Sequence, residues 1–574
     1  MQFDTHKSHS VITRTFCACL LIPACAMINP ATATADEPRF VDHSLLVAPE
    51  YPCTWPSYPF PRFQITHQRR LGLDSAYNVD VLLIDGNTAT QLDVPPHSVA
   101  RPELNREKSG PYGLAYTDRI EAWQFGGEAC VVDVRDLLDQ ESNGVSPLVT
   151  ARHVKRFEQR HRRLHFGDVV LFRSDYSDRY YRPFPEGHRY ITDILERKAP
   201  GYPDPDPDCM EFLAKRRVMT LGTDSASMGP LPTLGEPTHY AGLKYGMIWT
   251  EGATNLGAIP PTGAFYCLLG PKHKDGAYGE GRAFSIVGGD LPKRLIASCT
   301  NKRAIDLSPT LSTDTPVTSP GFTTGDHRQT YLQINFLFIE YLDFWHHGHL
   351  MDSMAGTHLV PPSYTLPTAD EQPAYAPEVR GWLEEFETKY GKRGTSSMTT
   401  EKVPLSWTCG EARVIDVRSL VGTTERQQWP ASPEITPRHI QAFEKKHGSL
   451  NPGDVVIFHT GHIDTHLTPH PADRALWLDP LSGNSEGWPA PGPDAILYLK
   501  QKKIRCVATD APNLGGVDPR QALMTYWTLG SREMVGVEFL HNAGNIPDSN
   551  PYFLFAAVKV RDCHGGPGRA IVLY

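Results

Sequence analysis

Long apolar runs are missing from this chain after its first 35 residues, where no stretch reaches the roughly 18 residues that a membrane span requires. A basic excess is also missing, since the formal net charge is -9. Without a long apolar run we expect no membrane span. Binding to a phosphate backbone needs a basic surface, so we also expect no nucleic-acid partner. No G-x-x-x-x-G-K-[ST] loop occurs, which argues against P-loop nucleotide chemistry. The G-x-S-x-G match at 483–487 lies in a loop-like stretch, so we do not interpret it as a serine nucleophile.

Cysteine is scarce, with 11 in 574 residues, and no CxxC pair occurs. A zinc ribbon is therefore not expected. Three cysteines precede residue 36, and the others are scattered: Cys53, Cys130, Cys209, Cys267, Cys299, Cys409, Cys506 and Cys563. The sequence leaves disulfides and buried thiols equally open.

The first 35 residues have the pattern of a secretory signal peptide. Lys7 and Arg14 supply the positive end, a largely apolar stretch follows over 16–28, and residues 33–35 (A-T-A) offer a small-x-small cleavage site. A disordered tail is the alternative. The pattern predicts a mature, soluble protein that is secreted or periplasmic.

The chain contains a long internal repeat. Four pairs of segments match at a nearly constant offset, from 411 − 128 = 283 to 568 − 281 = 287. The pairs are 128–135 with 411–418, 167–172 with 453–458, 223–224 with 509–510, and 281–283 with 568–570. A smaller offset at the start of each copy predicts extra residues in the second copy before Glu411. We expect two tandem domains, at 38–300 and 301–574, each with its own core.

Each copy is predicted to be an α/β domain. Residues 131–134 and 169–172 are short β-branched runs, typical of buried strands. Between them an amphipathic helix is expected after Thr150, and its counterpart begins with Thr436 as N-cap and Pro437 in the first turn. Strand, helix and strand in this order indicate an α/β fold.

Residues 87–97 read N-T-A-T-Q-L-D-V-P-P-H, and residues 354–364 of the second copy read M-A-G-T-H-L-V-P-P-S-Y. Both resemble the H-x-G-T-H-x-D-x-P-x-H signature of the cyclase family, which includes kynurenine formamidase and isatin hydrolase. The resemblance implies two copies of a compact cyclase-like α/β domain, packed as an internal pseudo-dimer. Ala89 replaces the motif glycine, so we expect the turn there to differ.

Carried over by position, the resemblance assigns Asp93, His239 and Glu251 as metal ligands and His97 as the catalytic histidine. His239 and Glu251 are twelve residues apart, as in the family. Asn87 and Gln91 stand where the family has ligand histidines, and their amide oxygens are weaker ligands. This substitution favours an oxygen-rich site, so manganese or magnesium becomes more plausible beside zinc.

The second copy is expected to be degenerate. Met354, Val360, Tyr364 and Tyr526 stand at the ligand and catalytic positions, which leaves two possible ligands, His358 and Glu538. Two ligands do not hold a catalytic ion in a defined geometry. The tract W-H-H-G-H at 345–349 is interpreted as a polar loop or part of the domain interface, with metal binding as the alternative.

The predicted function is metal-dependent hydrolysis of a carbon–nitrogen bond in a formamide or cyclic amide. The most specific prediction is arylformamidase-like activity. The hydrolase class comes from the resemblance. Two alternatives remain open: a non-catalytic protein that binds a small molecule or a metal, and a lyase or cyclodehydratase. The partner is expected to be a small-molecule substrate, and the chain a monomer or a homo-oligomer.

Overall fold

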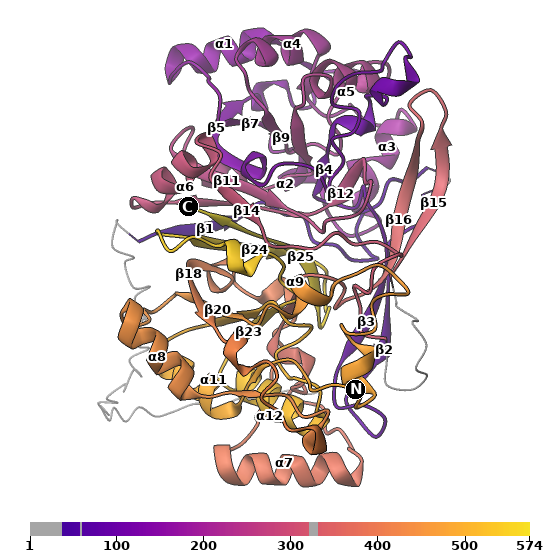
Figure 1. The fold of residues 1–574 in the computed structure, drawn as a ribbon. Coiled ribbons are helices and arrows are strands. Elements are labelled where there is room, and N and C mark those ends of the chain that lie inside the picture. Colours follow the sequence, from indigo (N-terminus) through magenta and orange to yellow (C-terminus); the bar gives the residue numbers. More distant parts are fainter. Residues whose placement is uncertain (1–36, 58–59, 321–330) are drawn as a thin grey trace, which may run out of the picture.

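The computed structural model describes residues 37–57, 60–320 and 331–574. The predicted signal peptide lies outside these ranges. The described chain forms two α/β copies whose sheets face each other at the centre, with the main helices at the two far ends (Figure 1).

The first copy is built on a nine-stranded sheet in which β5, β7, β9 and β10 are parallel and the other pairings are antiparallel. The strand at one end of the sheet, β12, is followed after Gly281 by β13, which lies next to the strand at the other end, β1. In sheet order the strands are β1 Arg39–Asp42, β13 Arg282–Val287, β11 Ala264–Leu269, β5 Gly126–Asp133, β7 Asp168–Arg173, β9 Thr220–Thr223, β10 Ile248–Glu251, β4 Gln91–Asp93 and β12 Tyr278–Glu280.

The second copy repeats this arrangement in an eight-stranded sheet. Here β25 takes the place of both β12 and β13, because it pairs with β17 at one end and with β24 at the other. In sheet order the strands are β14 Ala304–Asp306, β25 Gly566–Leu573, β17 His358–Val360, β23 Val535–Glu538, β22 Cys506–Thr509, β20 Val455–His459, β18 Cys409–Asp416 and β24 Tyr552–Ala557.

The larger helices cover the outer faces of both sheets, except α6, which packs in the core that the copies share (Figure 1). The first copy has α1 Ala151–Arg160, α2 Tyr176–Tyr180, α3 Thr192–Leu195, α4 Pro207–Lys215, α5 Gly235–Leu243 and α6 Leu291–Thr300. The second has α7 Pro377–Tyr390, α8 Pro437–His447, α9 His462–His466, α10 Leu478–Leu481, α11 Pro493–Gln501 and α12 Pro519–Ser531. None of the helices in the described ranges combines the length and hydropathy that a membrane span requires.

The local predictions agree with these elements. The β-branched runs lie in β5 and β7, and Thr150 caps α1 through a capping box with His153. Thr436 does the same for α8, with Pro437 in its first turn. The extra residues of the second copy contain α7, which packs at the outer end against α12 (Figure 1).

A third sheet joins the copies by exchange of strands. Its order is β15-β16-β3-β2, with β2 Gln64–Arg69 and β3 Val79–Asp85 from the first copy and β15 Tyr331–Ile339 and β16 Phe344–Asp352 from the second. The β15–β16 hairpin extends along one side of the first copy, and β2–β3 runs beside the second (Figure 1). The 345–349 tract therefore lies in strand β16 at the interface between the copies, which confirms the interface interpretation and not the polar loop.

The interface between the copies is apolar at its centre. One continuous core contains residues of β11, β13 and α6 together with residues of β24 and β25. All eight cysteines of the described chain are buried as free thiols, and Cys267, Cys299 and Cys409 belong to this shared core. Burial of apolar surface between the copies makes them one folding unit.

Two equivalent ion clusters border this core. In each one, an aspartate of one copy binds an arginine of its own copy and a lysine of the other. Asp42 binds Arg282 of its own copy (3.0 Å) and Lys559 of the other (2.9 Å). Asp306 likewise binds Arg569 (2.5 Å) and Lys272 of the first copy (3.0 Å). Burial alone would raise the pKa of both carboxyls, but their cationic neighbours lower it below the usual range. The reciprocal contacts are those of a two-fold dimer within one chain.

Replacing either carboxylate leaves two partly buried cations without their partner, so Asp42→Asn or Asp306→Asn should lower the free energy of unfolding at pH 7 by about 3 kcal/mol. A depressed folded-state pKa contributes stability above the unfolded value of about 3.9, and this contribution is lost as the pH falls through the folded value. Denaturant unfolding from pH 7 to pH 2 should therefore show the difference between wild type and each variant narrowing once the pH falls below the unfolded value. Asp290→Asn, at an exposed pair with Lys293, is the control and should change little; a constant difference across the pH range would contradict this account.

Candidate metal centre and active site

Strand β4 places the predicted motif residues on one face of the first sheet. Gln91 and Asp93 are two positions apart, so their side chains leave the strand on the same side. Antiparallel pairing with β10 sets Glu251 opposite Gln91, and pairing with β12 sets Tyr278 opposite Asp93. Asp93 is fully buried, and Glu251 is nearly so.

His239 reaches this face from helix α5. Its Nε2 lies 3.3 Å from Asp93 Oδ2 and 3.4 Å from Glu251 Oε1. Its Nδ1 lies 2.8 Å from the Gly235 carbonyl oxygen, which can only accept, so Nδ1 carries a proton and donates. In the neutral ring Nε2 therefore presents a lone pair to both carboxylates, which is the tautomer that a metal-ligating histidine adopts.

The carboxylate of Asp93 supplies the strongest evidence that this cluster is a cation site. Neither of its oxygens has a hydrogen-bond partner among the residues of the described ranges, although both are buried. Ligand atoms that bind one ion at about 2.0–2.2 Å lie roughly 3 Å from one another. The distances from His239 Nε2 to the oxygens of Asp93 and Glu251 are close to this value. The donor set of one imidazole and two carboxylates fits a divalent cation.

The electrostatics of the cluster point the same way. Burial and the neighbouring Asp93 raise the pKa of Glu251. Burial disfavours the charged form of His239, but its contacts with Asp93 and Glu251 outweigh this effect and raise its pKa well above the ordinary value. Two buried carboxylates thus require positive charge from a proton or a cation, and a bound cation would replace the proton.

His97 lies beside the cluster on the short 3-10 turn Pro95–His97. Its Nε2 is 3.7 Å from Asp93 Oδ2, and one atom each of Asp93, His97 and His239 lie within 4.8 Å of one another. Burial and the nearby His239 lower the pKa of His97 to about 3. The imidazole is therefore neutral at physiological pH and can accept a proton.

Asn87 and Gln91 are joined to the cluster by hydrogen bonds. Gln91 Nε2 donates to Glu251 Oε2 (2.8 Å) and to Asn87 Oδ1 (3.1 Å). These contacts favour a role in orienting Glu251. Ala89 has φ 56°, and the corresponding Gly356 has φ 57°. The expected difference in the turn was wrong, because the alanine adopts the same left-handed conformation despite its Cβ.

A cavity of about 320 Å³ opens above these residues, with His97, His239 and Glu251 at its base. Both copies build its walls. The first copy contributes Trp55, Phe60, Tyr202 and Leu231, and the β15–β16 hairpin of the second contributes Ile339, Tyr341, Leu342, Phe344 and His346. The cavity is at the small end of the range for ligand pockets. Five of the 20 residues that line it are Trp, Tyr or Phe, and both copies contribute to these five.

The equivalent position in the second copy has no free ligand atoms. His358 Nε2 lies 3.1 Å from Glu538 Oε2, and the Tyr526 hydroxyl donates to Glu538 Oε1 (2.7 Å). Tyr364 packs edge-on against Tyr526, and Tyr77, from just before strand β3 of the first copy, packs against both rings. Aromatic packing and hydrogen bonds thus take the place of a cation.

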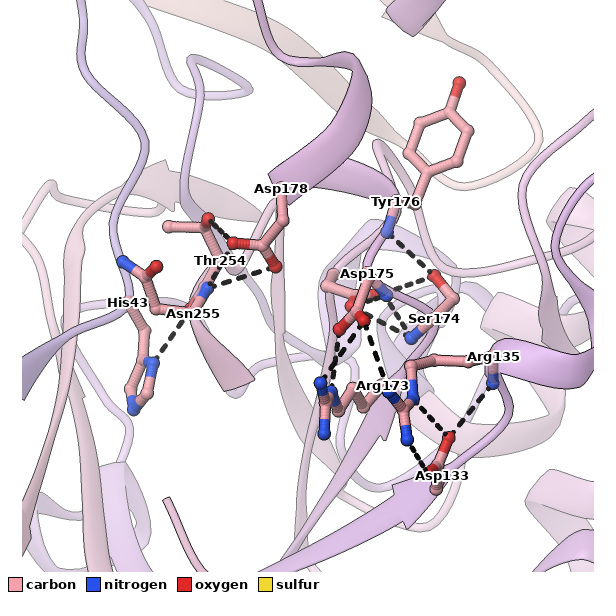
Figure 2. Close-up of polar contacts among 11 residues, drawn as sticks. His43, Asp133, Arg135, Arg173, Ser174, Asp175, Tyr176, Asp178, Thr254 and Asn255 are labelled. Atoms are coloured by element: carbon pink, nitrogen blue, oxygen red, sulfur yellow. Dashed lines mark hydrogen bonds and ion pairs between the residues drawn. The ribbon is translucent and has the colours of Figure 1, made fainter. Parts of the chain in front are cut away.

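A second cavity, of about 620 Å³, lies near the Thr223-Asp224 turn, and its charges are compensated. Arg173 pairs with Asp175, and Arg135 pairs with Asp133 (Figure 2). Asp178 accepts hydrogen bonds from Thr254 and Asn255 (Figure 2), and one of its oxygens lies within 4.8 Å of carboxylate oxygens of Asp175 and Asp224.

Asp224 itself accepts hydrogen bonds from the amides of Ser174 and Asp175, as Asp510 does from Thr460 and Gly461 in the second copy. The repeated Thr-Asp motif therefore holds the end of the neighbouring strand.

Comparison with known proteins agrees with this description. The family described as putative cyclases matches residues 35–230 and 305–515, which together exceed half of the chain. The chain therefore belongs to this family, as the motif predicted, and carries its domain twice.

Among named relatives, the isatin hydrolase of Roseibium aggregatum is 27% identical over 197 residues, or 31% of this chain and 72% of the relative. The kynurenine formamidase of Salinibacter ruber is 27% identical over 221 residues, or 38% and 84%. The solved structure of isatin hydrolase A from Labrenzia aggregata bound to benzyl benzoate matches with 21% identity and a TM-score of 0.36, covering 44% of this chain and 94% of that one.

The structure thus brings together all six residues singled out in the first copy, and adds others that the sequence did not reveal. Tyr278 packs edge-on against His97 (ring centroids 5.2 Å apart) and contacts His346 Nδ1 through its hydroxyl (2.9 Å). Phe344 also packs against His97. The one available signal was the 345–349 tract, whose partner strand could not be read from its composition.

If Glu251 is a ligand, Glu251→Gln should abolish most of the stabilisation by Mn²⁺. A ligand present at about 100 times its dissociation constant raises the free energy of unfolding by roughly 2.7 kcal/mol, and thermal unfolding with and without Mn²⁺ measures this change. Glu538→Gln, the same substitution at the equivalent strand position, is the control and should leave the Mn²⁺ response intact. An unchanged response in Glu251→Gln would remove Glu251 from the ligand set.

Proposed function

We propose that this protein is a metal-dependent hydrolase that cleaves a carbon–nitrogen bond in a formamide or cyclic amide, with an aryl formamide as the most specific substrate class. The convergence of Asp93, His239 and Glu251 on one point, with His97 beside them, carries the proposal. The family and the named relatives support the hydrolase class.

Asp93, His239 and Glu251 are the proposed metal ligands, and Gln91 and Asn87 hold Glu251 in place. A divalent cation at this position supplies Lewis acidity, which lowers the pKa of a water molecule and polarises a carbonyl group. Two carboxylates with a single imidazole favour manganese, while zinc and magnesium remain compatible with the donor set.

His97 is the proposed general base and acid. Its Nε2 faces the ligand cluster, and its depressed pKa keeps it unprotonated before reaction. It accepts a proton from the attacking water as the new carbon–oxygen bond forms. It then donates this proton to the leaving nitrogen as the carbon–nitrogen bond breaks, which yields a carboxylic acid and an amine.

The aromatic cavity supports an aryl substrate. Phe344, Phe60 and Trp55 offer apolar surface beside the cluster, and aromatic rings are favoured in such surroundings. The second copy is proposed to have no catalytic centre of its own and to serve the first by supplying the wall that contains Phe344.

We expect His97→Ala to lower kcat for an N-formyl aryl amide by roughly 10²- to 10⁴-fold, the usual contribution of a general acid–base. Metal content should stay at the wild-type level, whereas Asp93→Ala should lose both metal and activity. Steady-state kinetics with metal analysis of the same samples separates these cases. Loss of metal in His97→Ala would make it a ligand, and a metal-loaded wild type that turns over no formamide or cyclic amide would favour a binding protein.

Phe344→Ala tests the contribution of the second copy. Losing a buried aromatic contact of about 1–3 kcal/mol should raise KM for an aryl formamide by roughly 5- to 100-fold, with kcat changed less. The control is Phe338→Ala, an exposed residue of the same hairpin, which should leave both constants unchanged. Equal kinetics in the two variants would show that the hairpin does not contact the substrate.

A further inference from the structure

A second group of ligand side chains lies at the junction of the two copies. It consists of His273, from the segment before β12, Glu280 of β12 and His349 of β16. One ligand atom of each lies within 4.8 Å of those of the other two, and all three side chains are fully buried. The rings of His273 and His349 stack at 3.6 Å with an angle of 8°.

The hydrogen bonds of His273 direct a lone pair toward Glu280. The Tyr331 hydroxyl donates to the Leu311 carbonyl oxygen (3.4 Å), so it accepts from His273 Nδ1 (2.9 Å). The other nitrogen, Nε2, then has no proton and lies 3.0 Å from Glu280 Oε1. Two electron-rich atoms at this distance require a proton or a cation between them.

Other atoms of the group lack partners altogether. Within the part of the chain that the structure describes, neither ring nitrogen of His349 has a hydrogen-bond partner, and neither does Glu280 Oε2. His347, whose ring centroid is 5.2 Å from that of His349, also has a bare Nε2. A buried polar atom without a partner is destabilising, so four of them in one place indicate a ligand site.

We propose that His273, Glu280 and His349 bind a second divalent cation that links the two copies. Two imidazoles and one carboxylate favour zinc, in contrast to the more oxygen-rich first site. His347 Nε2 offers a further nitrogen. Each copy supplies at least one ligand, so the ion holds hairpin β15–β16 against the first copy, and this hairpin carries a wall of the catalytic cavity.

The two ligands that the first copy supplies are not repeated in the sequence of the second. At the repeat offset of 287 residues, Pro567 stands for Glu280 and Val560 for His273. The cation therefore breaks the internal symmetry of the chain. The rival explanation is a proton shared by Glu280 and His273, which would leave the group without affinity for metal.

Zinc analysis of the full-length protein, after equilibration with Zn²⁺ and removal of the excess, tests the proposal. His349→Phe keeps an aromatic ring in the stack but removes both nitrogens, so it should hold one zinc ion per chain fewer than wild type. His43→Phe is the control, since His43 is equally buried but its nitrogens contact Thr254 and Ser285. It should keep the wild-type zinc content.

A chain with Asp93→Ala and His239→Ala separates this site from the proposed catalytic one. It should still bind one zinc ion, and Co²⁺ in its place should show visible d–d absorption that disappears when His349→Phe is added. If His349→Phe does not fold, Glu280→Gln replaces it in both measurements. Equal zinc content in wild type and the folded variant overturns the proposal, whatever the outcome for the first site, and identifies the shared proton as the correct description.

Discussion

Two carboxylates, Asp93 and Glu251, are buried side by side against a single imidazole, and the arrangement of the first copy follows from this constraint. Removing charged groups from water costs several kcal/mol for each unless opposite charge and hydrogen bonds compensate. Strand β4 lies between β10 and β12, so the sheet itself holds the carboxylates in position while helix α5 supplies His239. The backbone thus fixes the geometry, and the proposed cation would balance the charge.

The second copy lacks this pair of buried carboxylates. Val360 replaces one carboxylate, and the remaining one, Glu538, is satisfied by Tyr526 and His358. With one buried carboxylate in place of two, and with that one hydrogen-bonded, this copy keeps the fold while its hairpin lines the cavity of the first copy. The exchange is mutual, because Tyr77 of the first copy packs into the filled site of the second as Phe344 packs beside His97. The duplicated copies therefore differ, because the first holds the ligand cluster and the second supplies a wall of the cavity above it.

Much of this organisation was predictable from the sequence, for local reasons. The buried strands β5 and β7 are runs of β-branched residues, and the caps at Thr150 and Thr436 are short-range signals. The ligand cluster was predictable because a motif of eleven residues and a spacing of twelve were enough to recognise the family. The pairing of β16 with β3 was not predictable, since these strands are far apart in the chain and the hydrophobic pattern of a strand does not identify its partner strand. The conformation of Ala89 was missed because tertiary contacts impose a left-handed turn that composition disfavours.

The exchanged hairpins have a consequence for how such a protein can change over time. In an ordinary dimer the two chains can separate. Here β15–β16 completes a cavity in the opposite copy, so deleting the second copy would leave the cavity of the first open on that side. The second copy can therefore change at its equivalent of the ligand cluster, yet it cannot be removed without loss of this wall. Neither copy is therefore structurally complete without the other.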